Sequence, residues 1–60
     1  MQLNAQGPWV VYVQGELWMD EATGRPWAFD FDDMAHQVAR QVWGQRASIR
    51  VAPAAEVGRG

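Results

Sequence analysis

The residues with the most reactive side chains lie close together in the middle of the chain. Asp30, Asp32 and Asp33 are nearly consecutive, and His36, the single histidine, follows them. Grouped carboxylates could bind a divalent metal ion, but such a site needs oxygen ligands that converge from several segments. Acids at the junction of a strand and a helix ordinarily accept hydrogen bonds from free backbone N–H groups and favour the helix dipole. We therefore predict that these aspartates cap a helix and that no metal is bound.

Catalysis by His36 would need a nucleophile and a group that orients the imidazole ring. The chain has no cysteine, and besides Tyr12 its hydroxyl side chains are Thr23 and Ser48, neither of which lies in a nucleophile motif. The glycines are spaced as turn residues, and no glycine-rich phosphate loop is present. The sequence therefore predicts a solvent-exposed histidine and a protein that is not an enzyme and holds no cofactor.

The aspartates mark a change in hydrophobic periodicity. Apolar residues alternate over 27–31, which predicts a strand. The following apolar residues recur at helical spacing and predict a helix over about 32–43, which Gly44 would end. The stripe of this helix comprises Met34, Ala35, Val38, Ala39, Val42 and Trp43.

Three further segments have the composition of strands. Residues 9–13 are β-branched or aromatic throughout, and the short turn Gln14-Gly15 would join them to a second strand over 16–20. Alternation returns over 47–52, where we expect a short strand that Pro53 terminates.

These elements predict a small α+β protein, a two-layer sandwich in which a three-stranded antiparallel meander is followed by one helix and a short fourth strand (β-β-β-α-β). A right-handed crossover would place the fourth strand beside the first and parallel to it, in the order 4-1-2-3. Sixty residues form one domain at most. We assign that domain to residues 8–53, with a flexible leader over 1–7 and a flexible tail over 54–60.

Strand alternation divides the apolar residues between two faces of the predicted sheet. The face expected under the helix carries Trp9, Val11, Val13, Leu17, Met19, Trp27, Phe29, Phe31, Ile49 and Val51. The opposite face carries Val10, Tyr12, Trp18, Ala28 and Arg50, together with Glu16, Asp20 and Asp30. One helix cannot cover both faces, so Val10, Tyr12 and Trp18 are expected to form an exposed strip of the kind that marks a contact surface.

A binding role follows from that strip. Tyr, Trp and Arg commonly anchor protein interfaces, and acids around them would complement a basic target. The chain is therefore expected to act as a non-enzymatic protein-binding module that forms a homodimer or binds another protein. In the alternative in which nothing is bound, Arg50 or the terminal segments cover Trp18. The expected partner-binding residues are Val10, Tyr12, Glu16, Trp18, Asp20 and Arg50.

Nucleic-acid binding is the alternative function. Phosphate binding relies on several Lys or Arg contacts, which an acidic chain of net charge −2 provides poorly. All five basic residues are arginines, and most of them lie in the second half of the chain. Such a role would use Arg40, Arg46, Arg50 and Arg59.

Two features bear on where the protein resides. No apolar run approaches the roughly 20 residues of a membrane span. The first six residues also lack the basic and apolar parts of a signal peptide. The sequence therefore predicts a cytoplasmic protein that does not enter a membrane.

The layout of residues 8–43 resembles that of short proteins encoded by phages, plasmids and prophage islands, which often pair a Trp-containing hairpin, a Gly-Arg-Pro turn and an Ala-rich helix. The matching segments are Trp9-Val10-Val11, Gly24-Arg25-Pro26-Trp27-Ala28-Phe29, Ala35 and Val38-Ala39. The resemblance implies a protein that binds a host complex and inhibits or redirects it. It carries over no functional residue.

Overall fold

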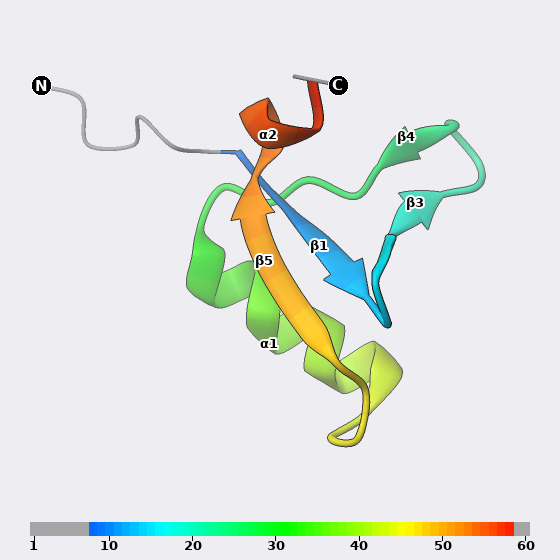
Figure 1. Cartoon of the computed structure of the whole chain (residues 1–60), viewed down its shortest axis with the longest axis vertical. Coiled ribbons are helices and arrows are strands. Elements are labelled where there is room, and N and C mark those ends of the chain that lie inside the picture. Colours follow the sequence, from blue (N-terminus) through cyan, green and yellow to red (C-terminus); the bar gives the residue numbers. More distant parts are fainter. Residues whose placement is uncertain (1–7, 59–60) are drawn as a thin grey trace, which may run out of the picture.

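Two small antiparallel sheets and one long helix make up the part of the chain that the structure, a computed structural model, describes, namely residues 8–58 (Figure 1). The α+β class is confirmed. The predicted leader, 1–7, and the end of the predicted tail, 59–60, lie outside the described residues. The elements are β1 (Trp9–Val13), β2 (Glu16–Leu17), β3 (Met19–Asp20), β4 (Arg25–Pro26), α1 (Asp32–Trp43), β5 (Ile49–Pro53) and α2 (Ala54–Gly58).

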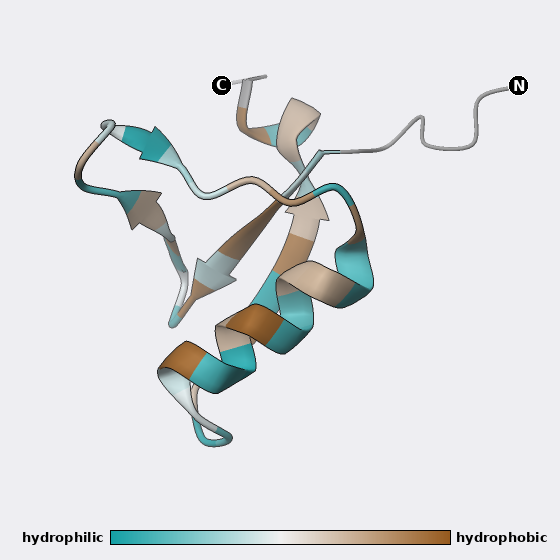
Figure 2. Ribbon diagram, turned by 180° about the vertical axis from the view of Figure 1, so that it is seen from behind, coloured by the Kyte–Doolittle hydropathy of each residue, from teal (hydrophilic) through white to brown (hydrophobic). Residues whose placement is uncertain are grey.

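The main sheet has three strands in the order β2-β1-β5, and β3 pairs with β4 in a second sheet. The predicted neighbours of the first strand are thus confirmed on both sides. Helix α1 covers one face of the β1–β5 pair, and the β3–β4 hairpin stands away from that pair (Figures 1 and 2). We refer to this hairpin as the arm.

A two-residue turn sets the register between β1 and β2. Gln14 and Gly15 both have positive φ angles, 52° and 82°, which is the pattern of a type I′ turn. The turn aligns Val13 with Glu16 and Tyr12 with Leu17. Residues directly opposite one another share a face of the sheet, so Leu17 lies on the side of Tyr12.

The predicted faces of the second strand were therefore wrong. The Trp18 N–H donates to the Val11 carbonyl over 2.9 Å, and Trp18 packs against the core beneath α1. The prediction placed Trp18 on the open face and Leu17 under the helix. The two-residue turn itself was predicted correctly, but it pairs Val13 with Glu16, so every side chain of the second strand lies on the face opposite to the one assigned.

The second predicted strand is interrupted at Trp18, where the chain leaves β1 and enters the arm. The chain returns after β4: the Trp27 N–H donates to the Trp18 carbonyl over 3.1 Å. Trp9 and Phe29 then exchange two backbone hydrogen bonds of 2.7 and 2.9 Å. Of the strand predicted over 27–31, the structure has this single antiparallel bridge at Phe29.

Strand β5 runs antiparallel to β1, so the prediction of a parallel fourth strand was wrong. The chain leaves β1 to form the arm and then returns to it. At Phe29 it runs antiparallel to β1, the same direction that it had in β2. Helix α1 then carries it back, and β5 has the direction of β2. Strands β2 and β5 thus run parallel on either side of β1.

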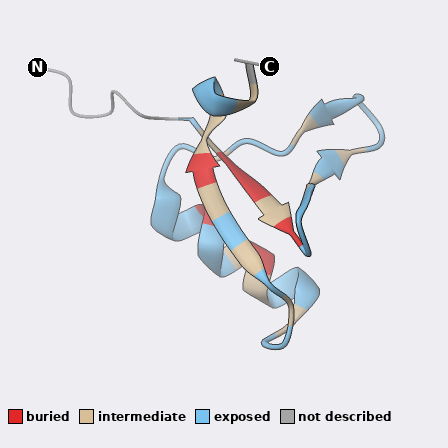
Figure 3. Ribbon diagram, in the orientation of Figure 1, coloured by how far each residue is buried: buried red, intermediate tan, exposed pale blue. Residues whose placement is uncertain are grey.

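The core consists of small residues. Val11 and Val13 of β1 form a buried cluster with Ala35 and Ala39 of α1. Because alanine side chains are short, the helix backbone can approach the sheet closely. Half-buried residues surround this cluster, and they include Trp9, Phe29, Ile49 and Val51, which were expected under the helix. Figure 3 shows the buried positions confined to β1, the end of β5 and the inner side of α1.

Several residues expected under the helix or in its buried stripe lie at the surface instead. The sheet is narrower than predicted, since the segment after β4 contributes one bridge rather than a strand. Side chains at the flanks of α1 therefore have no strand beneath them. The exposed large apolar residues are Met19, Trp27, Phe31, Met34, Val42 and Trp43.

Helix α1 has the predicted bounds, but its first turn differs from the prediction. The N-cap residue is Phe31, and no side chain caps it. The Asp32 carboxylate instead accepts a hydrogen bond of 2.7 Å from the Asp33 N–H. At the other end Gly44 closes the helix as expected, with φ 92° and an N–H that donates to the Arg40 carbonyl over 2.8 Å.

Arg40 holds the loop between α1 and β5 in place. Its Nη1 atom donates to the carbonyls of Gly44, Gln45 and Ala47 at 3.0, 3.0 and 2.9 Å. These carbonyls follow the last turn of the helix, where a cation is also favoured by the helix dipole. The guanidinium thus fixes the point from which β5 starts.

Helix α2 was missed, because residues 54–60 were expected to form a tail. The Ala54 N–H donates to the Pro8 carbonyl over 2.9 Å, which extends the pairing of β1 with β5. The chain then turns into α2, which contacts β5.

We predict that Arg40→Met lowers the free energy of unfolding by about 1–3 kcal/mol, because loop carbonyls would lose a charged donor. Urea unfolding followed by Trp fluorescence would measure the change. The control is Arg46→Met, which removes an exposed arginine and should change the free energy by less than about 0.5 kcal/mol. Equal effects of the two substitutions would contradict the role assigned to Arg40.

Candidate partner-binding groove

The structure divides the predicted aromatic strip between two places. Val10 is buried, at 2% exposure, opposite Ala52 on the neighbouring strand, so the prediction that it lies exposed was wrong. Tyr12 is half-buried beside Arg50, whose guanidinium carbon lies 4.7 Å from the centre of the ring. Trp18 lies on the opposite face. The three residues therefore do not form one surface.

Trp18 instead belongs to a cluster of aromatic rings where the arm meets α1. Its ring centre lies 5.6 Å from that of Trp27, 6.3 Å from that of Phe29 and 6.0 Å from that of Trp43. The Trp43 ring meets Trp18 edge to face, at 82°. The cluster thus brings together three segments: the residues after β4, the junction between β2 and β3, and the last turn of α1.

The three tryptophan rings, Trp18, Trp27 and Trp43, line a hollow with a volume of about 640 Å³, which we call the aromatic groove. Trp18 is half-buried, while Trp27 is 40% exposed and Trp43 is 46% exposed. Met19, at 42% exposure, also lines the hollow. The complete lining is Val13, Gln14, Glu16, Leu17, Trp18, Met19, Asp20, Glu21, Ala22, Trp27 and Trp43.

The charged residues of the groove all have the same sign. Glu16, Asp20 and Glu21 line it, and none of the described residues in its lining is basic. Carboxylates beside tryptophan faces suit an apolar side chain next to a cation, because the ring face attracts positive charge. Lysine and arginine side chains combine an apolar stem with a cationic head.

Sequence reasoning found part of this groove. Trp18, Glu16 and Asp20 were expected at a partner site and do line it, whereas Met19, Trp27 and Trp43 were assigned to the buried side. The signal that could have joined them is the two-residue hairpin turn. It places Trp18 on the helix side, where the final turn of the helix ends in Trp43.

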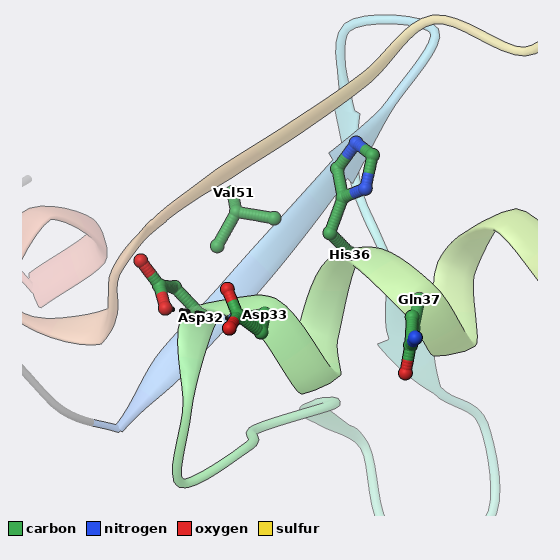
Figure 4. A pocket seen from close by; sticks show the side chains of 5 residues that line it. All are labelled: Asp32, Asp33, His36, Gln37 and Val51. Carbon is green, nitrogen blue, oxygen red and sulfur yellow. Dashed lines mark hydrogen bonds between the residues drawn. The ribbon is translucent and has the colours of Figure 1, made fainter.

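A second hollow of about 490 Å³ lies between α1 and β5 and is lined by Asp32, Asp33, His36, Gln37 and Val51 (Figure 4). It contains His36 and two of the three aspartates considered for chemistry, Asp32 and Asp33, whereas Asp30 does not line it. Within residues 8–58, no group of three or more His, Cys, Asp or Glu side chains is placed to hold a metal ion.

The arginines considered for nucleic-acid binding are differently engaged. Arg40 bonds to loop carbonyls, and Arg50 lies over Tyr12 with its Nη1 4.0 Å from a Glu56 oxygen. Arg46 is exposed, and Arg59 lies outside the described residues.

Comparison of the chain with protein-family models, with curated proteins and with solved structures finds no match. The resemblance to short phage and plasmid proteins therefore stays a prediction. Across residues 8–58, none of the helices combines the length and the apolar character needed to cross a membrane.

We predict that Trp18→Ala lowers the free energy of unfolding by about 3 kcal/mol, because it removes the ring that contacts Trp27, Phe29 and Trp43. Trp27→Ala should lower it by only about 1 kcal/mol, since this ring is more exposed. Urea unfolding followed by far-ultraviolet circular dichroism would compare the two. A larger loss for Trp27→Ala would show that Trp18 is not the centre of the cluster.

Proposed function

We propose that this chain is a small, non-enzymatic protein-binding module that uses the aromatic groove to hold an apolar, basic segment of a partner protein. The observation that carries the proposal is the gathering of Trp27, Trp43 and Met19, all partly exposed, in one hollow with an acidic lining. This surface replaces the strip inferred from the sequence, and it retains Trp18, Glu16 and Asp20 from the expected site.

The exposure of these residues supports an interface. Contiguous apolar surface is rare on soluble proteins unless it contacts a partner. Tryptophan is the residue type most enriched among those that dominate binding energy. The half-buried Trp18 contacts both exposed tryptophan rings, so that a partner would meet a surface already held in place.

The charge of the groove supports a cationic partner. Glu16, Asp20 and Glu21 would attract a basic segment and repel an acidic one. Their side chains line the hollow, so an arginine or lysine stem could lie on a tryptophan face with its head near a carboxylate. A second copy of the chain could supply that segment from its arginines, and so could another protein.

The biological setting of the proposal comes from the sequence alone. If the layout reflects a mobile-element origin, the partner would be a host protein complex in the cytoplasm that the chain inhibits or modulates. Nucleic-acid binding is less well supported, because Arg40 and Arg50 have partners within the chain.

The test is a fluorescence titration with a short peptide of alternating arginine and leucine, compared with a peptide in which neutral citrulline replaces arginine. We expect the arginine peptide to change the tryptophan emission and to bind at least about tenfold more tightly than the citrulline peptide. Added salt should weaken the binding.

Trp27→Ala should weaken binding of the arginine peptide by about tenfold or more, since it removes an exposed ring of the groove. The control is Phe31→Ala, which removes an exposed ring that does not line the groove. Light scattering over a tenfold concentration range would show whether the chain itself supplies the partner. Absence of both peptide binding and self-association would refute the proposal.

A further inference from the structure

Strand β5 forms one edge of the main sheet, in the order β2-β1-β5. Two hydrogen bonds fix which of its backbone groups face β1: the Gln14 N–H donates to the Ser48 carbonyl, and the Ala54 N–H donates to the Pro8 carbonyl, both over 2.9 Å. In an antiparallel pair, hydrogen-bonded and non-bonded positions alternate. The backbone groups of Ile49 and Val51 therefore point away from β1, toward the open edge.

The hollow between α1 and β5 lies beside this edge. In Figure 4, Asp32, Asp33 and His36 extend from α1 on the side where β5 passes, and Val51 lies among them. The hollow holds about 490 Å³ and shares no lining residue with the aromatic groove. An extended segment placed along β5 would thus have a strand edge on one side and acidic side chains within reach.

We propose that the outer edge of β5 binds an extended, basic segment of another protein as an added strand. The N–H and C=O groups of Ile49 and Val51 would supply the main-chain hydrogen bonds, as in other cases of strand addition. Pro53 has no N–H, so the donors of this edge within β5 are those two residues.

Charge determines which face of the added strand is basic. Side chains on its helix-facing side would meet Asp32 and Asp33, which favour lysine or arginine there. Side chains on the other face would lie toward Arg50, which is exposed and would repel a cation. The segment therefore carries its basic residues at alternate positions, on one face.

A second copy of the chain fits this edge poorly. Antiparallel pairing of two β5 strands about a two-fold axis would place both α1 helices on one face of the joined sheet. Asp32 and Asp33 of one copy would then approach the same residues of the other, and the two Arg50 side chains would share the opposite face. Like charges brought together in this way oppose the pairing.

The test uses Trp27→Ala protein, so that binding in the aromatic groove does not interfere. A short peptide alternating valine and lysine is compared with one alternating valine and glutamate, and amide hydrogen exchange is followed by NMR. The valine–lysine peptide should slow the exchange of the Ile49 and Val51 amides by at least about tenfold, and the glutamate peptide should not. Equal or absent protection would overturn the proposal.

Two variants locate the contact. Val51→Pro removes an N–H that points away from β1, so no bond to β1 is lost, and proline is tolerated at such edge positions. This substitution should weaken lysine-peptide binding by about tenfold. Asp33→Lys, at an exposed position, should weaken it by about two- to fivefold. Asp30→Lys makes the same charge change at an exposed position that lines neither hollow and should leave the binding unchanged.

The outcomes separate the possible occupants. If free protein doubles its mass in light scattering and its Ile49 and Val51 amides are already protected, a second copy occupies the edge and the proposal is wrong. If Asp33→Lys and Asp30→Lys have equal effects, the acids beside β5 do not select the segment and the proposal is also wrong. Neither result would bear on the aromatic groove, whose lining residues are different.

Discussion

The turn at Gln14 and Gly15 is the constraint on which the rest of the structure depends. Because it contains two residues, Val13 must pair with Glu16, and this alignment places Trp18 on the face that α1 covers. Trp18 then meets Trp43 at the end of the helix and Trp27 at the base of the arm. A turn one residue longer would place Trp18 on the opposite face of the sheet, where it could not contact Trp27 or Trp43. The position of the groove is thus a consequence of hairpin geometry.

The choice of small residues in α1 has a related effect. With Ala35 and Ala39 facing Val11 and Val13, the buried core is filled by short side chains. The large rings cannot fit between helix and sheet, so they are displaced to the margins, where Trp27 and Trp43 remain partly exposed. The small core residues therefore leave large apolar side chains exposed at the edge of the helix–sheet contact. These exposed side chains are available to contact a partner.

Local patterns predicted the local elements well. The bounds of α1, the closure at Gly44, β1, and the strand after the helix all follow from periodicity and turn residues. The arm could not be foreseen in this way, because Met19 and Trp27 fit an alternating strand whether or not the chain leaves β1 between them. Missing that excursion also reversed the expected direction of β5. For the groove, Trp18, Glu16 and Asp20 were recognised, whereas Trp27 and Trp43 needed the tertiary arrangement to bring them there.

The hydrogen bond between the Ala54 N–H and the Pro8 carbonyl has a topological consequence. It joins the residue before β1 to the residue after β5, so the chain enters β1 and leaves β5 at one corner of the fold. The aromatic groove is lined by Val13 and Gln14, at the far end of β1. Sequence attached at this corner would therefore lie away from the groove. A fold with both attachment points at one corner is suited to insertion into a surface loop of another protein.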